Sequence, residues 1–242
     1  MNSRTISIVL FDLDDTLHDD TRAFVEAAQE VAGQIAAEHG IDALALKNAY
    51  VSQAHGFWSR LSTEHLENRL GTVREALWHA ALKDVGLSDI KLAERSAERY
   101  NACRKRHFAL FPGALDLLHG LRASGKKLGL VTNGFSETHR EKIELLQLGK
   151  AFDAVFIADE VGMLKPDPLL FTHACTTLGG PPQHAAMVGD RYDRDIVGAL
   201  AAGLYTVWLN VRDETLPPGV RAPNAVCRNI SEVGPLLEAA SR

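Results

Sequence analysis

The chain has 242 residues, of which 46% are hydrophobic and 24% are charged, values typical of a globular protein. Since one domain takes about 150 residues, this length predicts a core domain with a smaller module beside it. The 26 basic and 31 acidic residues leave a net charge of −5, which argues against a dedicated binder of nucleic acids or of anionic membranes.

The N-terminus and the cysteines predict a cytoplasmic location. The first apolar run, Ile8–Phe11, ends at once in Asp12, so no signal peptide is recognised, and no apolar stretch approaches the ~20 residues of a membrane helix. The cysteines are odd in number and lack C-x-x-C spacing, which disfavours disulfide frameworks and zinc ribbons and favours a reducing compartment. They are Cys103, Cys175 and Cys227.

Short apolar runs, each closed by polar residues or glycine, recur along the chain. Because they are apolar on both faces, they suit buried parallel strands better than half-exposed antiparallel ones. The runs are Ile6–Phe11, Lys127–Thr132, Ala154–Ala158, Ala186–Gly189 and Tyr205–Leu209. Helical patterns lie between the later runs and start at Ser136, at Asp167–Pro168 and at about Asp193. This alternation predicts an α/β fold with a doubly wound parallel sheet.

Residues 17–109 break the alternation, because about ninety residues without a convincing strand follow the first strand. Helical patterns fill this stretch, at Thr21–His39, Ala43–Arg60, Thr72–Val85 and Asp89–Phe108. The third of these helices would begin with a capping box, in the sequence Thr72-Val-Arg-Glu75. We therefore expect an inserted all-α domain at 17–109 and a core formed by 1–16 and 110–242. After Val211 that core is expected to be turn-rich, with one short strand near Ala225–Cys227.

Two acidic residues follow the first predicted strand. Asp12 and Asp14 are two positions apart, so their side chains point the same way at the tip of the strand. Open α/β sheets bind ligands just beyond the carboxyl ends of their strands, which is where this pair falls. Taken alone, the pair is also compatible with an acidic turn that has no function.

Three further strand ends carry polar residues. Thr132, Asn133 and Gly134 follow the second strand, Lys165 follows the third, and Asp190, Asp193 and Asp195 follow the fourth. Singly, each has an ordinary explanation: Asn-Gly is a common turn, a lysine is usually exposed, and either later aspartate could cap a helix. Their order at successive strand ends favours one shared site.

This ordered set resembles the haloacid dehalogenase (HAD) superfamily in its phosphatase branch. The four motifs of that superfamily occur in order over a core of about 150 residues. They are Asp12, Asp14 and Thr16 in D-x-D-x-T, then Thr132, then Lys165, and finally Gly189, Asp190 and Asp195 in G-D-x-x-x-x-D. The resemblance implies a Rossmann-like core, and the helical insertion resembles the superfamily's type-one cap domain.

The resemblance also implies a magnesium-dependent phosphatase that works through an aspartyl-phosphate. Asp12 would be the nucleophile, and Asp14 would be the general acid and base. Mg²⁺ would be bound by the carboxylates of Asp12 and Asp190 and by the backbone carbonyl of Asp14, since a phosphate dianion is otherwise repelled by a bare carboxylate. Thr132 and Lys165 would complete the catalytic set.

The other candidates would bind the substrate or support the catalytic residues. Asp195, with Asp193 as its neighbour, would orient Lys165 or a water bound to the metal. His18, at the junction of core and insertion, is the best candidate for contacting the leaving group. The residues expected at the transferred phosphoryl group are Thr16, Thr132, Asn133, Gly134 and Lys165.

The expected substrate is a small soluble phosphate, because an inserted cap domain would cover the site and disfavour proteins or polymers as substrates. Nucleoside monophosphates and sugar phosphates are the leading candidates, and stacking on Phe57 or Trp58 would favour the former. A phosphomutase and a 2-haloacid dehalogenase of the same superfamily are alternatives. Thr16 mildly disfavours the mutase, and Asp14 disfavours the dehalogenase, because a halide leaves without an acid. A phospho-signalling receiver-like module is the non-enzyme alternative, which the long insertion disfavours.

Overall fold

The computed structural model describes residues 5–241, and the chain divides into two compact units. One unit comprises the chain up to Asp19 together with Leu110 and all that follows, and the other is Asp20–Ala109. Each unit has a hydrophobic core of its own.

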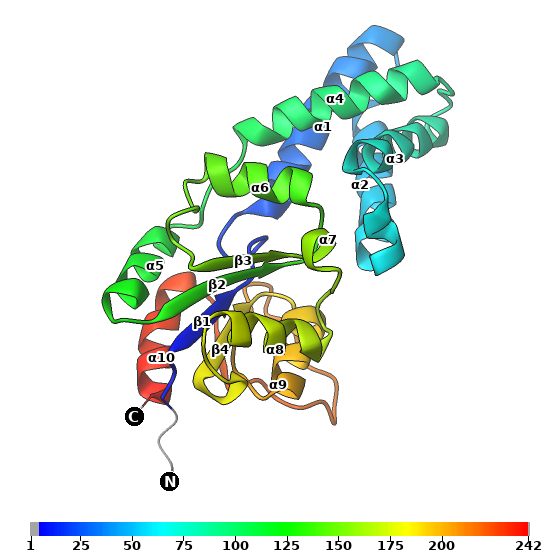
Figure 1. Cartoon of the computed structure of the whole chain (residues 1–242). Helices are drawn as coiled ribbons and strands as arrows, with labels where there is room; N and C mark the ends of the chain where they lie inside the picture. The colour runs from blue at the N-terminus through cyan, green and yellow to red at the C-terminus, as the bar shows by residue number, and fades with distance from the viewer. Residues whose placement is uncertain (1–4, 242) are drawn as a thin grey trace. The chain divides into compact units, whose positions relative to one another are not determined.

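The first unit is built on a parallel sheet (Figure 1). Within residues 5–241 the sheet has six strands: β1 Ile8–Phe11, β2 Lys127–Thr132, β3 Ala154–Ile157, β4 Ala185–Gly189, β5 Tyr205–Leu209 and β6 Ala225–Cys227. Their order is β3-β2-β1-β4-β5-β6, and every neighbouring pair is parallel. The predicted doubly wound sheet is thus confirmed. Its order reverses between β1 and β4, and such sheets bind ligands at the carboxyl ends of the strands at this point.

Helices cover the sheet on both sides. They are α5 Ala114–Ala123, α6 Ser136–Leu145, α7 Ala158–Val161, α8 Pro168–Thr177, α9 Val197–Ala202 and α10 Val233–Ala240, with short turns η2 Pro182–His184, η3 Tyr192–Ile196 and η4 Ile230–Glu232. On one face, Ile8 and Leu10 belong to the same buried cluster as Leu170 of α8 and Ala199 of α9. Since alternate residues of a strand point to opposite faces, Phe11 is directed to the other side.

The segment beyond Val211 contains α10 in addition to the expected strand β6, so the turn-rich prediction was incomplete. Pro217, Pro218 and Gly219 led to that prediction, whereas Gly234 and Pro235 lie in the first turn of α10. Proline is tolerated there, because the first N–H groups of a helix have no intrahelical acceptor. The buried side chains of Val233 and Leu237 attach the helix to the core.

The second unit is entirely helical. Residues 20–109, all of which the structure describes, form α1 Asp20–His39, α2 Ala43–Ser59, the 3₁₀ turn η1 Thr63–Glu67, α3 Leu70–Asp84 and α4 Ile90–Arg106. Aromatic rings fill its centre, where Tyr50 stacks on Trp78 with ring centroids 4.0 Å apart. Phe24 and Tyr100 pack around this pair. The bounds of the four α-helices lie within two residues of those expected from the sequence.

The predicted capping box at Thr72 does not form. The helix α3 starts at Leu70, two residues earlier, and its N-cap is Arg69. Starting there buries the Leu70 side chain, and this burial outweighs the local capping signal. A capping box does form at η1, where the Ser62 backbone N–H donates to His65 Nδ1 at 3.1 Å.

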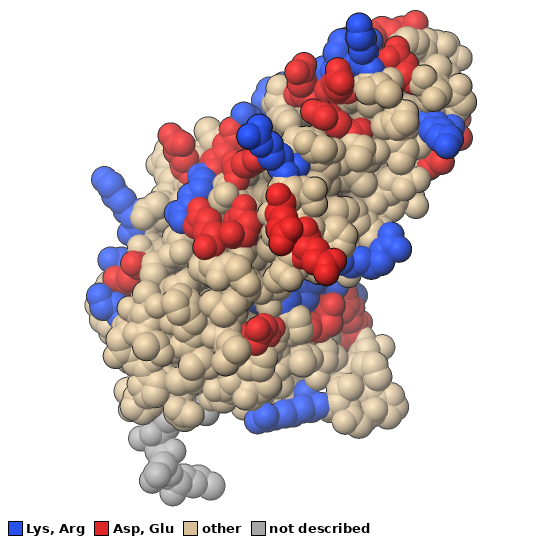
Figure 2. Space-filling view, turned by 45° about the vertical axis from the view of Figure 1, so that its right-hand side comes forward, with Lys and Arg blue, Asp and Glu red and all other residues tan. Residues whose placement is uncertain are grey.

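None of the helices within residues 5–241 combines the length and the apolar character that crossing a bilayer requires. On the described surface visible in Figure 2, basic and acidic side chains are interspersed, and no broad area is basic.

Candidate active site

Three buried carboxylates meet beyond the carboxyl ends of β1 and β4. They belong to Asp12, Asp190 and Asp195, and each offers an oxygen within 4.8 Å of the others. Asp12 directly follows β1, and its backbone N–H donates to the carbonyl oxygen of Val188 at 3.0 Å. This bond continues the pairing of β1 with β4 and fixes where the Asp12 side chain emerges.

Lys165 lies between two of these carboxylates. Its Nζ atom is 2.6 Å from Asp12 Oδ1 and 2.7 Å from Asp195 Oδ1, and its side chain is buried. Asn133 fixes the backbone of this lysine by two bonds: the Lys165 N–H donates to Asn133 Oδ1 at 2.8 Å, and Asn133 Nδ2 donates to the Lys165 carbonyl oxygen at 2.9 Å. The Asn133 side chain, expected from the sequence at the phosphoryl group, is therefore used to hold Lys165.

The cluster carries more negative charge than Lys165 neutralises. Burial raises the pKa of Asp12 to about 7, with a further contribution from Asp195, although Lys165 opposes the shift. Burial raises the pKa of Asp190 to about 8, and the neighbouring Asp12 and Asp195 add to this. Burial alone would lower the pKa of Lys165, but Asp12 and Asp195 raise it to about 12. Crowded carboxylates of this kind are suited to a divalent cation.

Thr16 and Arg212 bind Asp190 from two sides. The backbone N–H of Asp190 donates to Thr16 Oγ1 at 3.0 Å, and the Thr16 side chain is buried. Arg212 Nη1 lies 3.3 Å from Asp190 Oδ2, and Arg212 Nη2 lies 2.8 Å from Asp15 Oδ2. Arg212 was not predicted from the sequence, although it lies just beyond the carboxyl end of β5, at the edge of the sheet where the other site residues lie.

Asp195 and Asp193 have different surroundings. Asp195 is fully buried, and its Oδ2 accepts the backbone N–H of Arg191 at 2.9 Å. A Cβ atom at Gly189 would lie 2.3 Å from Asp195 Oδ2, so only glycine leaves room for this carboxylate. Asp193 was predicted beside Asp195, but its side chain is 61% exposed and pairs with Arg191. Asp193 is therefore not part of the cluster.

The carboxylate of Asp14 is held by Lys142 of α6, and the ring of His139 lies beside it. Lys142 Nζ lies 2.7 Å from both Oδ1 and Oδ2 of Asp14, and His139 Nε2 lies 3.4 Å from Oδ2. Neither basic residue was singled out from the sequence, because no motif contains them.

The remaining predicted residues lie at or near the same edge of the sheet. Thr132 is the last residue of β2 and is buried, and Gly134 follows it with φ +145°. The His18 side chain is also buried, and the His18 backbone forms bridges with Asp14 and Leu110. Neither fact tests a contact between His18 and a substrate, so that role stays a prediction.

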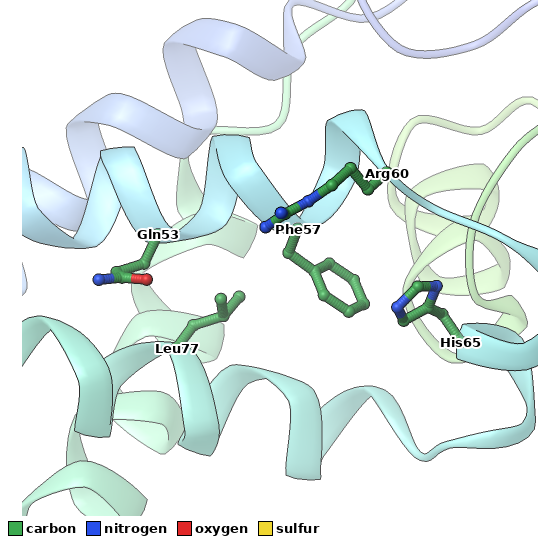
Figure 3. Close-up of a pocket in the computed structure, with 5 residues that line it drawn as sticks. All are labelled: Gln53, Phe57, Arg60, His65 and Leu77. Carbon is green, nitrogen blue, oxygen red and sulfur yellow. The ribbon is translucent and has the colours of Figure 1, made fainter.

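A separate pocket of about 460 Å³ lies within the helical unit (Figure 3). Phe57 points from α2 toward His65, with ring centroids 5.2 Å apart, and Arg60 folds back so that its Nε donates to the Gly56 carbonyl oxygen at 2.9 Å. The lining residues are Gln53, Phe57, Arg60, His65 and Leu77. The pocket thus combines an aromatic ring with a guanidinium and an imidazole.

The doubly wound sheet and the acid–lysine cluster at its switch point together define an α/β enzyme. Residues 6–203 match the family described as haloacid dehalogenase-like hydrolase, and the chain belongs to this family. This result confirms the resemblance drawn from the four motifs.

Two relatives and one solved structure show similarity over most of the chain. The phosphoserine phosphatase of Thermus thermophilus is 33% identical over 224 residues, which cover 85% of this chain and 89% of that protein. The N-acylneuraminate-9-phosphatase of Mus musculus is 31% identical over 248 residues, covering 98% and 96%. The structure of the HAD-hydrolase YfnB from Bacillus subtilis, bound to magnesium, matches with a TM-score of 0.75 at 25% identity, covering 96% of this chain and 99% of that one. These similarities and the family match identify the chain as a phosphatase.

Proposed function

We propose that the protein is a magnesium-dependent phosphomonoester hydrolase that acts on a small soluble phosphate through an aspartyl-phosphate. The observation that carries this proposal is the buried Lys165, which lies within 2.7 Å of both Asp12 and Asp195 beside the carboxylate of Asp190. A carboxylate nucleophile needs such positive charge beside it, because the incoming phosphate is itself an anion.

The donor set fits Mg²⁺. Its ligands would be the carboxylates of Asp12 and Asp190 and the backbone carbonyl of Asp14, all of them oxygen donors. When bound, Mg²⁺ supplies positive charge that offsets the repulsion between the substrate phosphate and Asp12. The raised pKa values of Asp12 and Asp190 support this fit, since they reflect buried carboxylates without enough neighbouring positive charge.

The reaction would proceed in two displacements at phosphorus. In the first, an oxygen of Asp12 forms a bond to phosphorus while the ester P–O bond breaks, and Asp14 gives its proton to the leaving alcohol. In the second, Asp14 takes a proton from water, which attacks phosphorus, releases phosphate and restores the Asp12 carboxylate. Thr132 and the amide at Gly134 would hold the phosphoryl oxygens, and Lys165 would stabilise their charge.

The helical unit would serve as the cap that selects the leaving group. Its pocket offers Phe57 for stacking and Arg60 for an anionic or hydroxylated group, which suits a nucleoside monophosphate or a sugar phosphate. The names of the two relatives reported above likewise refer to small organic phosphates. A phosphomutase remains the second candidate, since the same two aspartates would serve it. The acid at Asp14 argues against dehalogenation, because a halide ion leaves without a proton.

The purified protein is expected to release phosphate from a panel of nucleoside monophosphates, sugar phosphates and p-nitrophenyl phosphate when Mg²⁺ is present. Chelation should lower the rate of phosphate release to the background. The site proposed for Mg²⁺ offers three oxygen ligands and no histidine or cysteine, so zinc is not expected to take its place. Phosphate release is measured with and without chelator, and Mg²⁺ is then added back. Full activity after exhaustive chelation, or the absence of release from every ester, would reject the proposal.

Binding of Mg²⁺ is expected to release protons at neutral pH. Asp12 and Asp190, with pKa values raised to about 7 and about 8, are partly protonated at pH 7, and metal ligands must be ionised. The affinity for Mg²⁺ should therefore rise with pH between about 6 and 8 and fall as the pH drops through the raised pKa values. Titration calorimetry in two buffers of different ionisation enthalpy measures the protons released. Binding without proton release at pH 7 would contradict the ligand set.

A reducing compartment such as the cytoplasm is proposed as the site of action. The structure supports this with Cys103, Cys175 and Cys227, all of them buried and none in a disulfide.

A further inference from the structure

The helix α6 places two basic side chains against the carboxylate of Asp14. Lys142 Nζ contacts both oxygens at 2.7 Å, and the side chain of this lysine is 1% exposed, compared with 28% for Asp14. His139 approaches the same carboxylate to 3.4 Å and is also buried. The reaction steps proposed above assign no role to either residue.

The burial of Lys142 calls for an explanation other than packing. An ammonium group taken out of water loses its hydration, and the attraction within one ion pair rarely exceeds this loss of free energy. An apolar side chain of similar size would hold α6 against the sheet at least as well. A buried lysine that reaches both oxygens of Asp14 thus indicates that the orientation of this carboxylate is what matters.

His139 is fixed in place by its own contacts. Its Nδ1 donates to the Phe135 carbonyl oxygen at 2.9 Å, which directs the opposite edge of the ring away from the helix backbone. A Cβ atom at Gly134 would lie 2.3 Å from Cε1 of this ring, and Gly134 adopts φ +145°. Glycine at 134 is therefore required for the ring to lie where it does, with its Nε2 edge 3.4 Å from the Asp14 carboxylate.

We propose that Lys142 is a positioning residue that holds the Asp14 carboxyl group in the orientation required for proton transfer, and that the His139 ring supports this arrangement by packing beside the pair. The proposal rests on the function proposed above, in which Asp14 protonates the leaving alcohol. Because Lys142 contacts both oxygens, the carboxyl group cannot rotate without losing a bond, while its partly exposed side stays accessible. The transferred proton moves from Asp14 to the alcohol oxygen, and Lys142 neither gains nor loses a proton.

The test uses three phosphate esters of similar size whose leaving groups need protonation to different degrees. They are p-nitrophenyl, phenyl and benzyl phosphate, in order of increasing need. The ratio kcat/KM reports formation of the phosphoenzyme, in which the alcohol departs. Lys142→Met keeps an unbranched side chain that is one atom shorter and carries no charge. It is expected to lower kcat/KM about 10²-fold with benzyl phosphate, the lower end of what general acid catalysis contributes, and less than about 5-fold with p-nitrophenyl phosphate.

Two variants and one control accompany this measurement. Lys142→Arg keeps a cation that can donate to both carboxylate oxygens and should recover most of the rate with benzyl phosphate. His139→Gln should show the same dependence on the ester at smaller amplitude, since the His139 ring packs beside Asp14 at 3.4 Å without a hydrogen bond to it. Lys150→Met removes an exposed lysine from the same unit and should leave all three values unchanged.

Equal losses with all three esters would overturn the proposal, because they would show that Lys142 binds the phosphoryl group or only supports α6. The absence of any loss would overturn it as well. If Lys142→Met does not fold, the ester dependence of His139→Gln decides. Failure of the proposed function is seen separately in the wild-type enzyme, as a lack of covalent phosphate on Asp12. A flat ester dependence beside a normal phosphoenzyme therefore rejects the positioning role alone.

Discussion

Asp12→Asn is expected to lower the hydrolysis of every phosphomonoester by at least about 10⁴-fold and to remove the covalent phosphoenzyme. An amide lacks the charge and the nucleophilic oxygen of a carboxylate. Asparagine matches aspartate in size, so the buried site keeps its packing, and Lys165 still has Asp195 as a partner at 2.7 Å. Phosphate release gives the loss of turnover, and mass spectrometry after an acid quench gives the loss of the label.

The control for this prediction is Asp193→Asn. Asp193 is an aspartate that follows the neighbouring strand β4, but its exposed carboxylate pairs with Arg191 outside the cluster. Its substitution should leave turnover within about 2-fold of wild type, as is usual for a surface change away from the site. Covalent phosphate in Asp12→Asn, or wild-type turnover by this variant, would identify a different nucleophile.

The sheet and the cluster were predictable from the sequence for one physical reason. Asp12 and Asp190 come directly after β1 and β4, and Lys165 follows β3 after the short helix α7. The carboxyl ends of parallel strands share one edge of the sheet. Apolar runs identify the strands, so the residues that follow them can be placed without any knowledge of long-range contacts. Asp193 was misplaced because the π-helical turn Tyr192–Ile196 directs its side chain to solvent and that of Asp195 inward.

The contacts that fix the site were not predictable in this way. Lys142 lies 128 positions from Asp14, and Arg212 lies 197 positions from Asp15. Both are basic residues in segments where a solvated surface charge is the ordinary expectation. What distinguishes Lys142 is burial, and burial depends on how α6 packs against the sheet rather than on the residues beside it in the chain.

Residues of the site also hold one another in place by hydrogen bonds between neighbouring strand ends. Asn133, beyond β2, holds the backbone of Lys165, and Thr16, beyond β1, holds the backbone of Asp190. Gly189, at the end of β4, leaves the space that Asp195 occupies. Several motif residues therefore act on the reaction by fixing another motif residue. Asn133 is an example, because its side chain was predicted to contact the substrate and is bonded to the backbone of Lys165.

Asp14→Asn is expected to separate the two halves of the reaction. The substitution keeps the backbone carbonyl proposed to bind Mg²⁺ and leaves the nucleophile Asp12 intact. Attack should still proceed with p-nitrophenyl phosphate, because p-nitrophenolate departs with little protonation. Hydrolysis of the aspartyl-phosphate should slow by about 10²- to 10⁴-fold, since no base takes a proton from the attacking water.

The variant should therefore accumulate a hydroxylamine-sensitive aspartyl-phosphate and show a burst of about one p-nitrophenolate per active site before a slow steady state. With benzyl phosphate the first displacement itself should slow, and the burst should disappear, because that alcohol requires the proton of Asp14. Thermal unfolding is followed in parallel, since the buried Lys142 loses its carboxylate partner. Rapid-quench measurement of the burst and mass spectrometry of the label together locate the phosphate. A label on any residue other than Asp12, or undiminished hydrolysis of benzyl phosphate by Asp14→Asn, would reject the division of roles between the two aspartates.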